Sequence, residues 1–379
     1  MLEDLFDKRG IVGARLEKIF EEKGYTKATI CKESGVSRPT MDKILSGTLT
    51  NKTNYEKHMQ KLCNYLKLSP DALIGNGINR ANKTRQLRNA MNITSETLAK
   101  RTGISIERLK LIESGAAAST AELRDVALCL GVSVNVLQGM NFFEPQIAQS
   151  EFHSGVYGTE ELELNGFWGH VGILLNNRKE YLWYPITEST RNHILSSMEN
   201  ERLVMPCMNN KVLYLYMPNV KEIILNSFDC DTPEYVNWNP NVDCGEIPLV
   251  VYDAMEDYVV MDQNCIETEL ISKEFMRYLS QLINQKKWTE SEMHEVMDGT
   301  VVYYNDGTIR HLSVNFGNGF ETLSGEISII YDFGKTEVAD NVILVTDYQD
   351  SEIVINLKNV SMIQSPLIQV ENAICSEFD

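Results

Sequence analysis

The sequence has few cysteines, no recognisable metal motif and no long hydrophobic run. Of its 379 residues only eight are cysteine, no two of them form a CxxC pair, and no HExxH motif accompanies the six histidines. These spacings exclude a disulfide scaffold and match no zinc module. Apolar runs such as 247–251 fall far short of the roughly 18 residues that cross a bilayer. We therefore predict no metal, no cofactor and no association with membranes.

Signals for secretion and for nucleotide-dependent catalysis are also missing. The first ten residues, MLEDLFDKRG, carry acids where a secretion signal carries a basic region, and no GxxxxGK[ST] or GxGxxG motif occurs anywhere. No histidine has an evident serine or cysteine partner, so we predict no catalytic residues and do not expect an enzyme. Composition is that of an ordinary globular protein, and the length indicates two to four domains. We expect a soluble cytoplasmic protein.

Charge is distributed unevenly along the chain. Residues 1–76 hold 13 basic and 10 acidic side chains, residues 77–140 hold 9 and 5, and residues 141–379 hold 13 and 38. The net charges of the three segments are therefore +3, +4 and −25, which the overall value of −18 conceals. A polyanion such as nucleic acid fits only the basic N-terminal third.

A first internal repeat lies in this basic third, at a separation of 68 residues. Residues 26–37 align without a gap with residues 94–105, and each copy has a threonine first, a glycine tenth and a serine last. Threonine and serine favour the start of a helix, and glycine favours its end. The repeat therefore predicts, in each copy, a helix, a tight turn and a second helix.

Each copy resembles the five-helix Cro/repressor-type (XRE) helix-turn-helix domain, and the stretch TLAKRTGISIERLKLIESG of the second copy is the closer match. Members of that family often pair an arginine on the first helix with a glutamate near the end of the recognition helix. The resemblance places Arg88 and Glu113 at these positions in the second copy. The first copy has Phe20 and Leu45 there, so an apolar contact is expected to replace the ion pair.

The resemblance also implies which residues meet DNA, because in this fold the start of the second helix of the motif enters the major groove. In the first copy these candidates are Ser37, Arg38, Pro39, Thr40 and Lys43, with Lys27 at the position that grips a phosphate. In the second copy they are Ser105, Glu107, Arg108 and Lys110, with Ser95 at the phosphate position. The charges favour the first copy as the stronger reader. The second copy either assists or serves as a packing or dimerisation unit.

Beyond residue 154 the pattern changes to short alternating apolar runs, which predict strands bounded by Asn-Asn turns at 176–177 and 209–210. A second repeat appears here, with residues 202–224 facing 342–364 at a separation of 140, and with 173–177 resembling 302–306 upstream. Each copy resembles a small Sm-like or SH3-like barrel. Between the copies, Ser272 is predicted to cap one helix, and Thr289 with Glu292 to form a capping box for the next.

The predicted fold class is thus multidomain α+β: two tandem all-α five-helix domains, then a mostly β region of two small barrel-like modules joined by helices. The expected segments are 1–76 and 77–140 for the helix-turn-helix domains, 141–154 for a linker, 155–245 for the first module, 246–296 for the connecting helices and 297–379 for the second module.

The function that this organisation predicts is that of a sequence-specific DNA-binding transcriptional regulator, a repressor whose partner is double-stranded DNA. The C-terminal region would oligomerise with further copies or receive a small-molecule or protein signal. Two alternatives stay open at this point. One is an adaptor that uses the helical units as a scaffold for a protein or ligand, and the other is an RNA-binding protein acting through the barrels, which the net charge of −25 disfavours.

Overall fold

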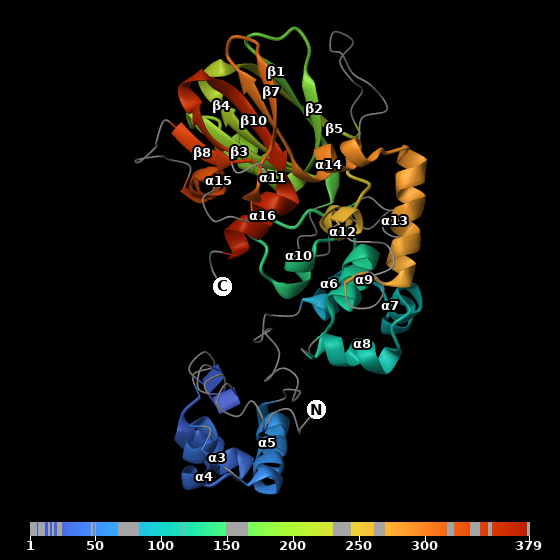
Figure 1. The fold of residues 1–379 in the computed structure, drawn as a ribbon, viewed down its shortest axis with the longest axis vertical. Helices are drawn as coiled ribbons and strands as arrows, with labels where there is room; N and C mark the ends of the chain where they lie inside the picture. Colours follow the sequence, from blue (N-terminus) through green and yellow to red (C-terminus); the bar gives the residue numbers. More distant parts are fainter. Residues whose placement is uncertain are drawn as a thin grey trace.

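The computed structural model describes residues 25–46, 48–49, 51–66, 83–114, 116, 118–148, 166–229, 244–260, 270–316, 322–333, 342–347 and 351–376, together with positions 6, 12, 13, 16, 19 and 20. Helices occupy the N-terminal part, and antiparallel strands with further helices follow, as the predicted fold class requires (Figure 1). No helix within these ranges is long and apolar enough to cross a membrane.

The first helical unit contains α3 (Lys27–Ser34), α4 (Arg38–Leu45) and α5 (Lys52–Leu66). Its hydrophobic core is formed by residues between Val12 and Leu66, and it is separate from the two other cores of the protein. The unit lies apart at the blue end of the chain (Figure 1). The predicted tail of this unit, residues 67–76, lies outside the described residues.

The second helical unit contains five described helices: α6 (Thr84–Ala90), α7 (Ser95–Thr102), α8 (Ile106–Glu113), α9 (Thr120–Leu130) and α10 (Val134–Gln138). Its core differs from that of the first unit because it continues into the C-terminal region. Leu109, Val126 and Leu130 belong to the same buried cluster as Val250 and Tyr214 of that region. The second unit is therefore packed onto the rest of the protein.

Within its described residues, the C-terminal region contains ten strands in three sheets. A three-stranded sheet has the order β2-β1-β5, a five-stranded sheet has the order β3-β4-β10-β6-β7, and a two-stranded sheet pairs β8 with β9. All of these pairings are antiparallel. The strands are β1 (Phe167–Leu175), β2 (Leu182–Thr187), β3 (Arg202–Cys207), β4 (Lys211–Tyr216), β5 (Val220–Ser227), β6 (Gly299–Tyr304), β7 (Ile309–Ser313), β8 (Val342–Thr346), β9 (Glu352–Asn356) and β10 (Val360–Pro366).

The two halves of the strand region repeat one topology, as the 140-residue repeat predicts. In the first half β1 pairs with β2 and β5, and β3 pairs with β4; in the second half β6 pairs with β7 and β10, and β8 pairs with β9. A helix follows the second strand of each half, α11 (Glu188–Ser196) or α15 (Thr322–Phe333), and a single 3-10 turn precedes the last strand, η2 (Met217–Asn219) or η4 (Leu357–Asn359).

Hydrogen bonds at the first hairpin are repeated as well. The amide of Asn176 donates to the carbonyl of Asn219 at 3.0 Å, and the equivalent amide of Asn305 donates to the carbonyl of Asn359 at 2.8 Å. The loop between the two strands meets the 3-10 turn in the same way in both halves. We call residues 167–227 module A and residues 299–366 module B.

The modules are not independent, which sequence periodicity alone does not indicate. Strand β4 of module A pairs with β10 of module B, so that one five-stranded sheet contains strands from both. The two predicted modules are thus joined by a shared sheet as well as by the helices between them. Burial accompanies the arrangement, because most residues of β4 and β10 are buried where the two strands meet.

Helices α12 (Leu249–Val260), α13 (Lys273–Lys286) and α14 (Glu290–Asp298) lie between the modules in the chain, and α16 (Leu367–Ser376) follows β10. The predicted caps of α13 and α14 are confirmed: Ser272 accepts a hydrogen bond from the amide of Phe275, and Thr289 with Glu292 forms a capping box. Residues 141–148 differ from the expected linker, because Phe143 and Ile147 are buried in the shared core. Residues 149–154 lie outside the described part of the chain.

Candidate nucleic-acid interface

The helix-turn-helix of the first unit is built by its caps and by one left-handed glycine. Thr26 precedes α3, and its hydroxyl accepts a hydrogen bond from the amide of Thr29 at 3.2 Å. Gly35 ends α3 with φ of +68°, a conformation that side chains with Cβ atoms disfavour. Val36 and Met41 are buried beneath the turn, which fixes α4 against α3. The expected helix, turn and helix are all present.

The recognition helix α4 presents two cations to solvent. Arg38 and Lys43 are exposed, and neither forms an ion pair with any described residue. Pro39 is exposed beside Arg38 and fits the first turn, where the amide that proline lacks has no helical partner. These side chains can therefore approach a groove without first breaking a contact in the protein.

Ser37 and Thr40 contact one another at the start of α4. Their hydroxyl oxygens lie 2.8 Å apart, and Ser37 makes no side-chain hydrogen bond to the backbone of the helix. Ser37 is the N-cap residue of α4, as the repeat predicts, but its side chain makes no capping hydrogen bond. The amides of the first turn of α4 are accordingly not occupied by Ser37, and amides at a helix N-terminus are donors that suit a phosphate.

Sequence reasoning missed the role of Asp42 in this interface. The ammonium of Lys27, the expected phosphate contact, lies 2.8 Å from a carboxylate oxygen of Asp42, and both side chains are about half exposed. An exposed pair of this kind contributes little to stability, so phosphate can compete for the lysine. The two residues are 15 positions apart, and no periodicity in the sequence indicates their contact.

The second unit has the same motif with better caps but fewer unpaired cations. Thr94 accepts from the amide of Thr97 at 3.1 Å, Ser105 accepts from the amide of Arg108 at 3.2 Å, and Gly103 has φ of +72°. Ser95, the expected phosphate contact, is half-buried at the start of α7.

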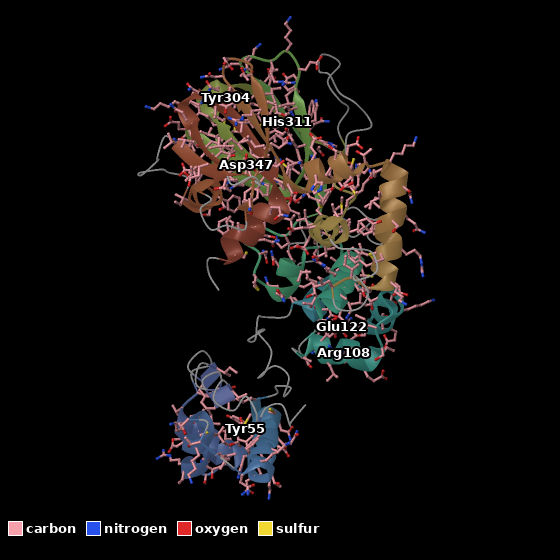
Figure 2. All side chains as sticks on the ribbon, in the orientation of Figure 1. Tyr55, Arg108, Glu122, Tyr304, His311 and Asp347 are labelled. Carbon is pink, nitrogen blue, oxygen red and sulfur yellow. The ribbon has the colours of Figure 1, made fainter. Side chains whose placement is uncertain are left out.

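The side chain of Arg108 is engaged within the second unit. Its Nε and Nη2 atoms each lie 2.7 Å from an oxygen of Glu122, in a two-pronged ion pair from α8 to α9 (Figure 2). Hydrogen bonds from Arg108 hold the pKa of Glu122 below its usual range. Glu107 and Lys110 are exposed on the same helix, and because their charges have opposite signs they add no net charge to it. The recognition helix α8 therefore offers less positive charge than α4.

The ion pair that the family resemblance implies is present in the second unit. Arg88 donates through Nε to Glu113 at 2.6 Å and through Nη1 to the carbonyl of Ile93 at 2.7 Å, and both charged side chains are buried. In the first unit Phe20 and Leu45 are buried members of one core, in agreement with an apolar replacement. The joint exchange removes both charges together, which avoids a buried charge without a partner.

A buried cluster of polar contacts joins the second unit to the C-terminal helices, and no sequence signal indicated it. Arg124 of α9 contacts Asp253 at 2.9 Å and Asp257 at 2.5 Å, both on α12. Asp125 accepts a hydrogen bond from Ser272 at 2.7 Å, and burial raises the pKa of its carboxyl to about 6. The orientation of α8 is consequently fixed relative to the strand region.

Known sequence families match both helical units. Residues 15–75 match the model of the Cro/C1-type HTH DNA-binding domain, and residues 85–137 match the model of a helix-turn-helix family. The N-terminal third holds two helix-turn-helix domains. These matches support a DNA-binding regulator of the XRE type. No curated protein and no solved structure matches the chain.

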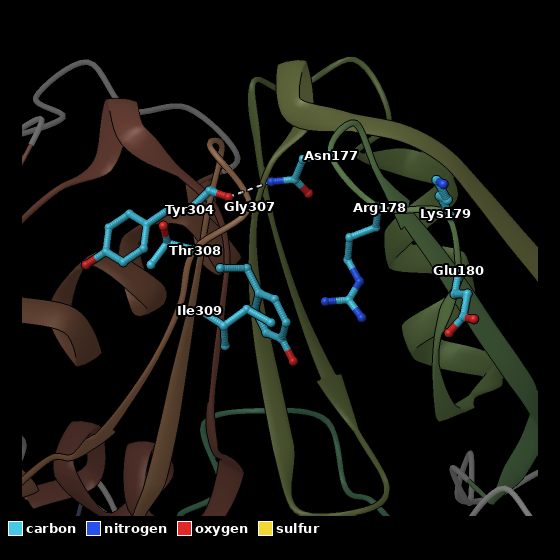
Figure 3. Close-up of a pocket in the computed structure, with 9 residues that line it drawn as sticks. Asn177, Arg178, Lys179, Glu180, Tyr304, Gly307, Thr308 and Ile309 are labelled. Carbon is cyan, nitrogen blue, oxygen red and sulfur yellow. Dashed lines mark hydrogen bonds between the residues drawn. The ribbon is translucent and has the colours of Figure 1, made fainter.

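A pocket of about 270 Å³ lies between the first hairpins of modules A and B (Figure 3). Asn177 of one hairpin donates through Nδ2 to the carbonyl of Tyr304 in the other at 2.6 Å. The guanidinium of Arg178 lies 5.7 Å from the ring centre of Tyr303, and its buried Nε has no hydrogen-bond partner among the described residues. The lining residues are Asn177, Arg178, Lys179, Glu180, Tyr303, Tyr304, Gly307, Thr308 and Ile309.

A metal centre is not indicated in the described part of the chain, where no group of three or more histidine, cysteine or acidic side chains could hold an ion. Cys230 lies outside that part of the chain. Cys63, Cys129 and Cys207 are free and buried, and burial raises the pKa of the Cys63 thiol to about 11. These thiols are poor nucleophiles and poor ligands at neutral pH.

Proposed function

We propose that this protein is a sequence-specific transcriptional repressor that reads operator DNA with its first helix-turn-helix domain. The observation that carries this proposal is the pair of exposed cations on α4, Arg38 and Lys43, in a unit whose core is separate from the rest of the protein. Arginine can contact two acceptors of guanine in the major groove, which is the commonest specific contact. The proposal assigns no catalytic role to any residue.

The second domain has a different role in this proposal. Its charged residues are largely engaged, Arg108 by Glu122 and Arg88 by Glu113, and its core is shared with the C-terminal region. These contacts support a domain that anchors the regulator to its strand region and contributes weaker, phosphate-directed contacts through Lys110. A repressor built in this way would occlude a promoter by binding, without a contact to polymerase.

The test is binding of the full chain to duplex DNA from its own upstream region, followed by fluorescence anisotropy between about 50 and 200 mM salt. Arg38→Ala should weaken specific binding by about 1 to 3 kcal/mol and reduce discrimination against unrelated DNA. Lys61→Ala, which removes one exposed charge from α5 of the same domain, is the matched control and should leave discrimination unchanged. Equal losses in the two variants would mean that α4 does not read bases.

We also propose that the C-terminal region oligomerises. We further propose that it senses a small anionic ligand, which would bind in the pocket between the two hairpins. A half-buried guanidinium over a tyrosine ring, with an unsatisfied Nε–H, is suited to a carboxylate or phosphate group. Inorganic phosphate and nucleoside monophosphates are the first probes, with thermal unfolding of the full chain as the readout. Stabilisation that is lost in Arg178→Ala and kept in Lys221→Ala would support the site, whereas equal behaviour of both variants would remove it.

A further inference from the structure

Modules A and B match strand for strand, and the register of their pairings matches as well. In module B, Val360 pairs with Tyr304 and Ile363 with Val302; in module A, the equivalent residues Val220 and Ile223 pair with Leu175 and Ile173. The irregularity in each pairing also falls at the equivalent place. The pair β3·β4 has the register of β8·β9, since Arg202 faces Tyr216 and Val342 faces Asn356.

The equivalence extends to the edges of the sheets. Strand β10 is the equivalent of β5, and β4 is the equivalent of β9. The chain joins β10 to β4 in its five-stranded sheet β3-β4-β10-β6-β7. Replacing each of these strands by its equivalent in the other module gives the order β8-β9-β5-β1-β2. The structure contains this order as two separate sheets, the two-stranded sheet β8-β9 and the three-stranded sheet β5-β1-β2. Among the described strands, only the junction between β9 and β5 is not made.

The unmade junction has partly exposed apolar residues at its centre, next to the exposed Lys221 and Glu222 of β5. Val354 of β9 is 67% exposed, whereas its equivalent Tyr214 in β4 is 1% exposed within the existing junction. Ile223 and Ile224 of β5 are half-buried, although they lie at an edge. An exposed apolar edge strand is a template for pairing with another strand unless something covers it. The chemistry of the two edges is therefore that of an interface.

Adjacent exposed residues belong to the same surface. In the existing junction, α15 of module B packs on β3 of module A, and Arg202 of β3 pairs with Glu326 of α15 at 2.6 Å. The equivalent of Arg202 is Val342 of β8, which is 45% exposed, and α11, the equivalent of α15, exposes Leu195 at 49%. A second junction of the same kind would cover both of these apolar side chains.

A second copy of the chain is the occupant that fits these edges. If the two modules were related by an exact twofold axis, both the β4·β10 and the β9·β5 junctions would form within one chain. Only the β4·β10 junction forms, so the module interface is of the head-to-tail kind, which can continue from one molecule to the next. Strands β5 and β8 lie on opposite sides of the strand region (Figure 1). A chain therefore cannot join its own two edges in this arrangement.

We propose that β9 of one chain pairs antiparallel with β5 of a second copy, reproducing between molecules the β4·β10 junction within the chain. The inference deepens the oligomerisation proposed above and is independent of DNA reading. Transfer of the existing register, in which Ile363 faces Tyr214 and Gln364 faces Leu213, places Ile223 of one copy opposite Val354 of the next and Ile224 opposite Ile353. The side-chain amide of Asn219, which donates to the carbonyl of Val360 at 3.1 Å, has its counterpart in Asn359.

The register is tested by disulfide cross-linking between two full-length variants, Ile223→Cys and Val354→Cys, mixed and oxidised. Residues directly opposite in an antiparallel pair bring their Cβ atoms to about 5 Å, so a covalent dimer should form between the variants and neither should cross-link alone above the wild-type background. Leu225→Cys with Val354→Cys is the matched control, because Leu225 lies two residues further along β5, on the same face as Ile223, where the pairing with β1 is regular. Cross-linking at least tenfold weaker in this control is expected, and equal or absent cross-linking in both mixtures would overturn the register.

The interface is tested separately by the mass of the full chain in solution. Val354→Lys should shift the wild-type oligomer to single chains, whereas Ser313→Lys, which introduces the same charge on the edge strand β7, should leave the mass unchanged. An oligomer that persists in Val354→Lys would overturn this interface and leave oligomerisation standing. A wild-type protein that is a single chain at all concentrations would overturn both, while Arg38-dependent binding of DNA would still decide the proposed DNA function.

Discussion

Replacing Arg124 by alanine should uncouple the second helix-turn-helix domain from the strand region. The guanidinium is buried, with 7% of the side chain exposed, and it donates to Asp253, to Asp257 and to the carbonyl of Leu270. Although burial opposes its charge, the two carboxylates hold the pKa of Arg124 above its usual value. The substitution therefore leaves two like charges facing each other across an emptied site.

The size of this effect follows from the burial of the acids. Removing one partner of a buried ion pair costs about 3 to 5 kcal/mol, because the charge left behind is desolvated. Asp253 and Asp257 are 25% and 26% exposed, so water reaches them and the lower end of that range applies. We expect a loss of about 3 kcal/mol, which is about a hundredfold in the unfolding equilibrium.

The assay is urea unfolding of the full chain, followed by circular dichroism for the helices and by tryptophan fluorescence for the strand region, which holds Trp168 and Trp183. In the wild type, the second domain and the strand region should unfold together because they share a core. In Arg124→Ala, the helical signal should be lost at lower urea than the fluorescence signal. Asp253→Asn added to Arg124→Ala should restore part of the loss, since it removes a stranded charge.

Arg108→Ala is the matched control for this experiment. It breaks an arginine–carboxylate pair of similar geometry, but both side chains are part of the second domain and are 34% and 24% exposed. It should cost about 1 kcal/mol and leave the two signals in the same relation as in the wild type. If Arg124→Ala unfolds in one transition, and its free energy of unfolding falls no more than that of Arg108→Ala, then this cluster does not join the domain to the strand region.

Three further perturbations test other parts of the structure. Burial raises the pKa of the Glu371 carboxyl to about 7 from 4.5, so its stabilising effect is complete below pH 4.5 and is lost as the pH rises through 7. The wild type should therefore lose stability to urea between pH 4.5 and 8, and Glu371→Gln should make this loss smaller by up to about 3 kcal/mol. Asp42→Ala removes an exposed carboxylate from α4 and should tighten DNA binding by about 1 kcal/mol in anisotropy titrations, and unchanged affinity would place α4 away from phosphates. Gly35→Ala and Gly103→Ala should each lower the free energy of unfolding by about 1 kcal/mol, because both glycines have positive φ and no atom lies within 4 Å of an added Cβ. A cost above 3 kcal/mol in thermal unfolding of either variant would contradict a purely backbone effect.

Local features of the fold could be predicted from the sequence because each depends on residues that are close together in the chain. The caps at Thr26, Thr94 and Ser272 and the left-handed glycine after α3 follow from residue types at fixed spacing. The exposed cations Arg38 and Lys43 of α4 could be predicted as well. The contact of Lys27 with Asp42 could not, because it depends on how α3 and α4 cross. Ser37 is the N-cap residue of α4, but its hydroxyl contacts that of Thr40 and makes no hydrogen bond to the helix backbone.

Contacts between distant segments carried no sequence signal. Arg124 and its two aspartates are separated by more than a hundred residues, and each is an ordinary charged residue on an amphipathic helix. Residues 141–148 resemble a linker in composition, yet Phe143 supplies the aromatic ring that packs on Tyr331 at 4.9 Å. A short stretch in which polar residues alternate with apolar side chains can thus be buried, and composition does not distinguish it from a linker.

The 140-residue repeat has a consequence that a single module would not have. Duplication makes two copies of every edge, and a junction between the copies leaves one edge of each kind unused, here β5 and β9. In an assembly that uses these edges, each added chain brings another first domain, with its own separate core, to the same particle. Two such domains on one stretch of DNA bind with an effective concentration set by their tether, so operator affinity should fall when Val354→Lys separates the chains, even though α4 is unchanged. A loss of affinity in that variant only for DNA with two half-sites would connect the strand edges to the reading of DNA.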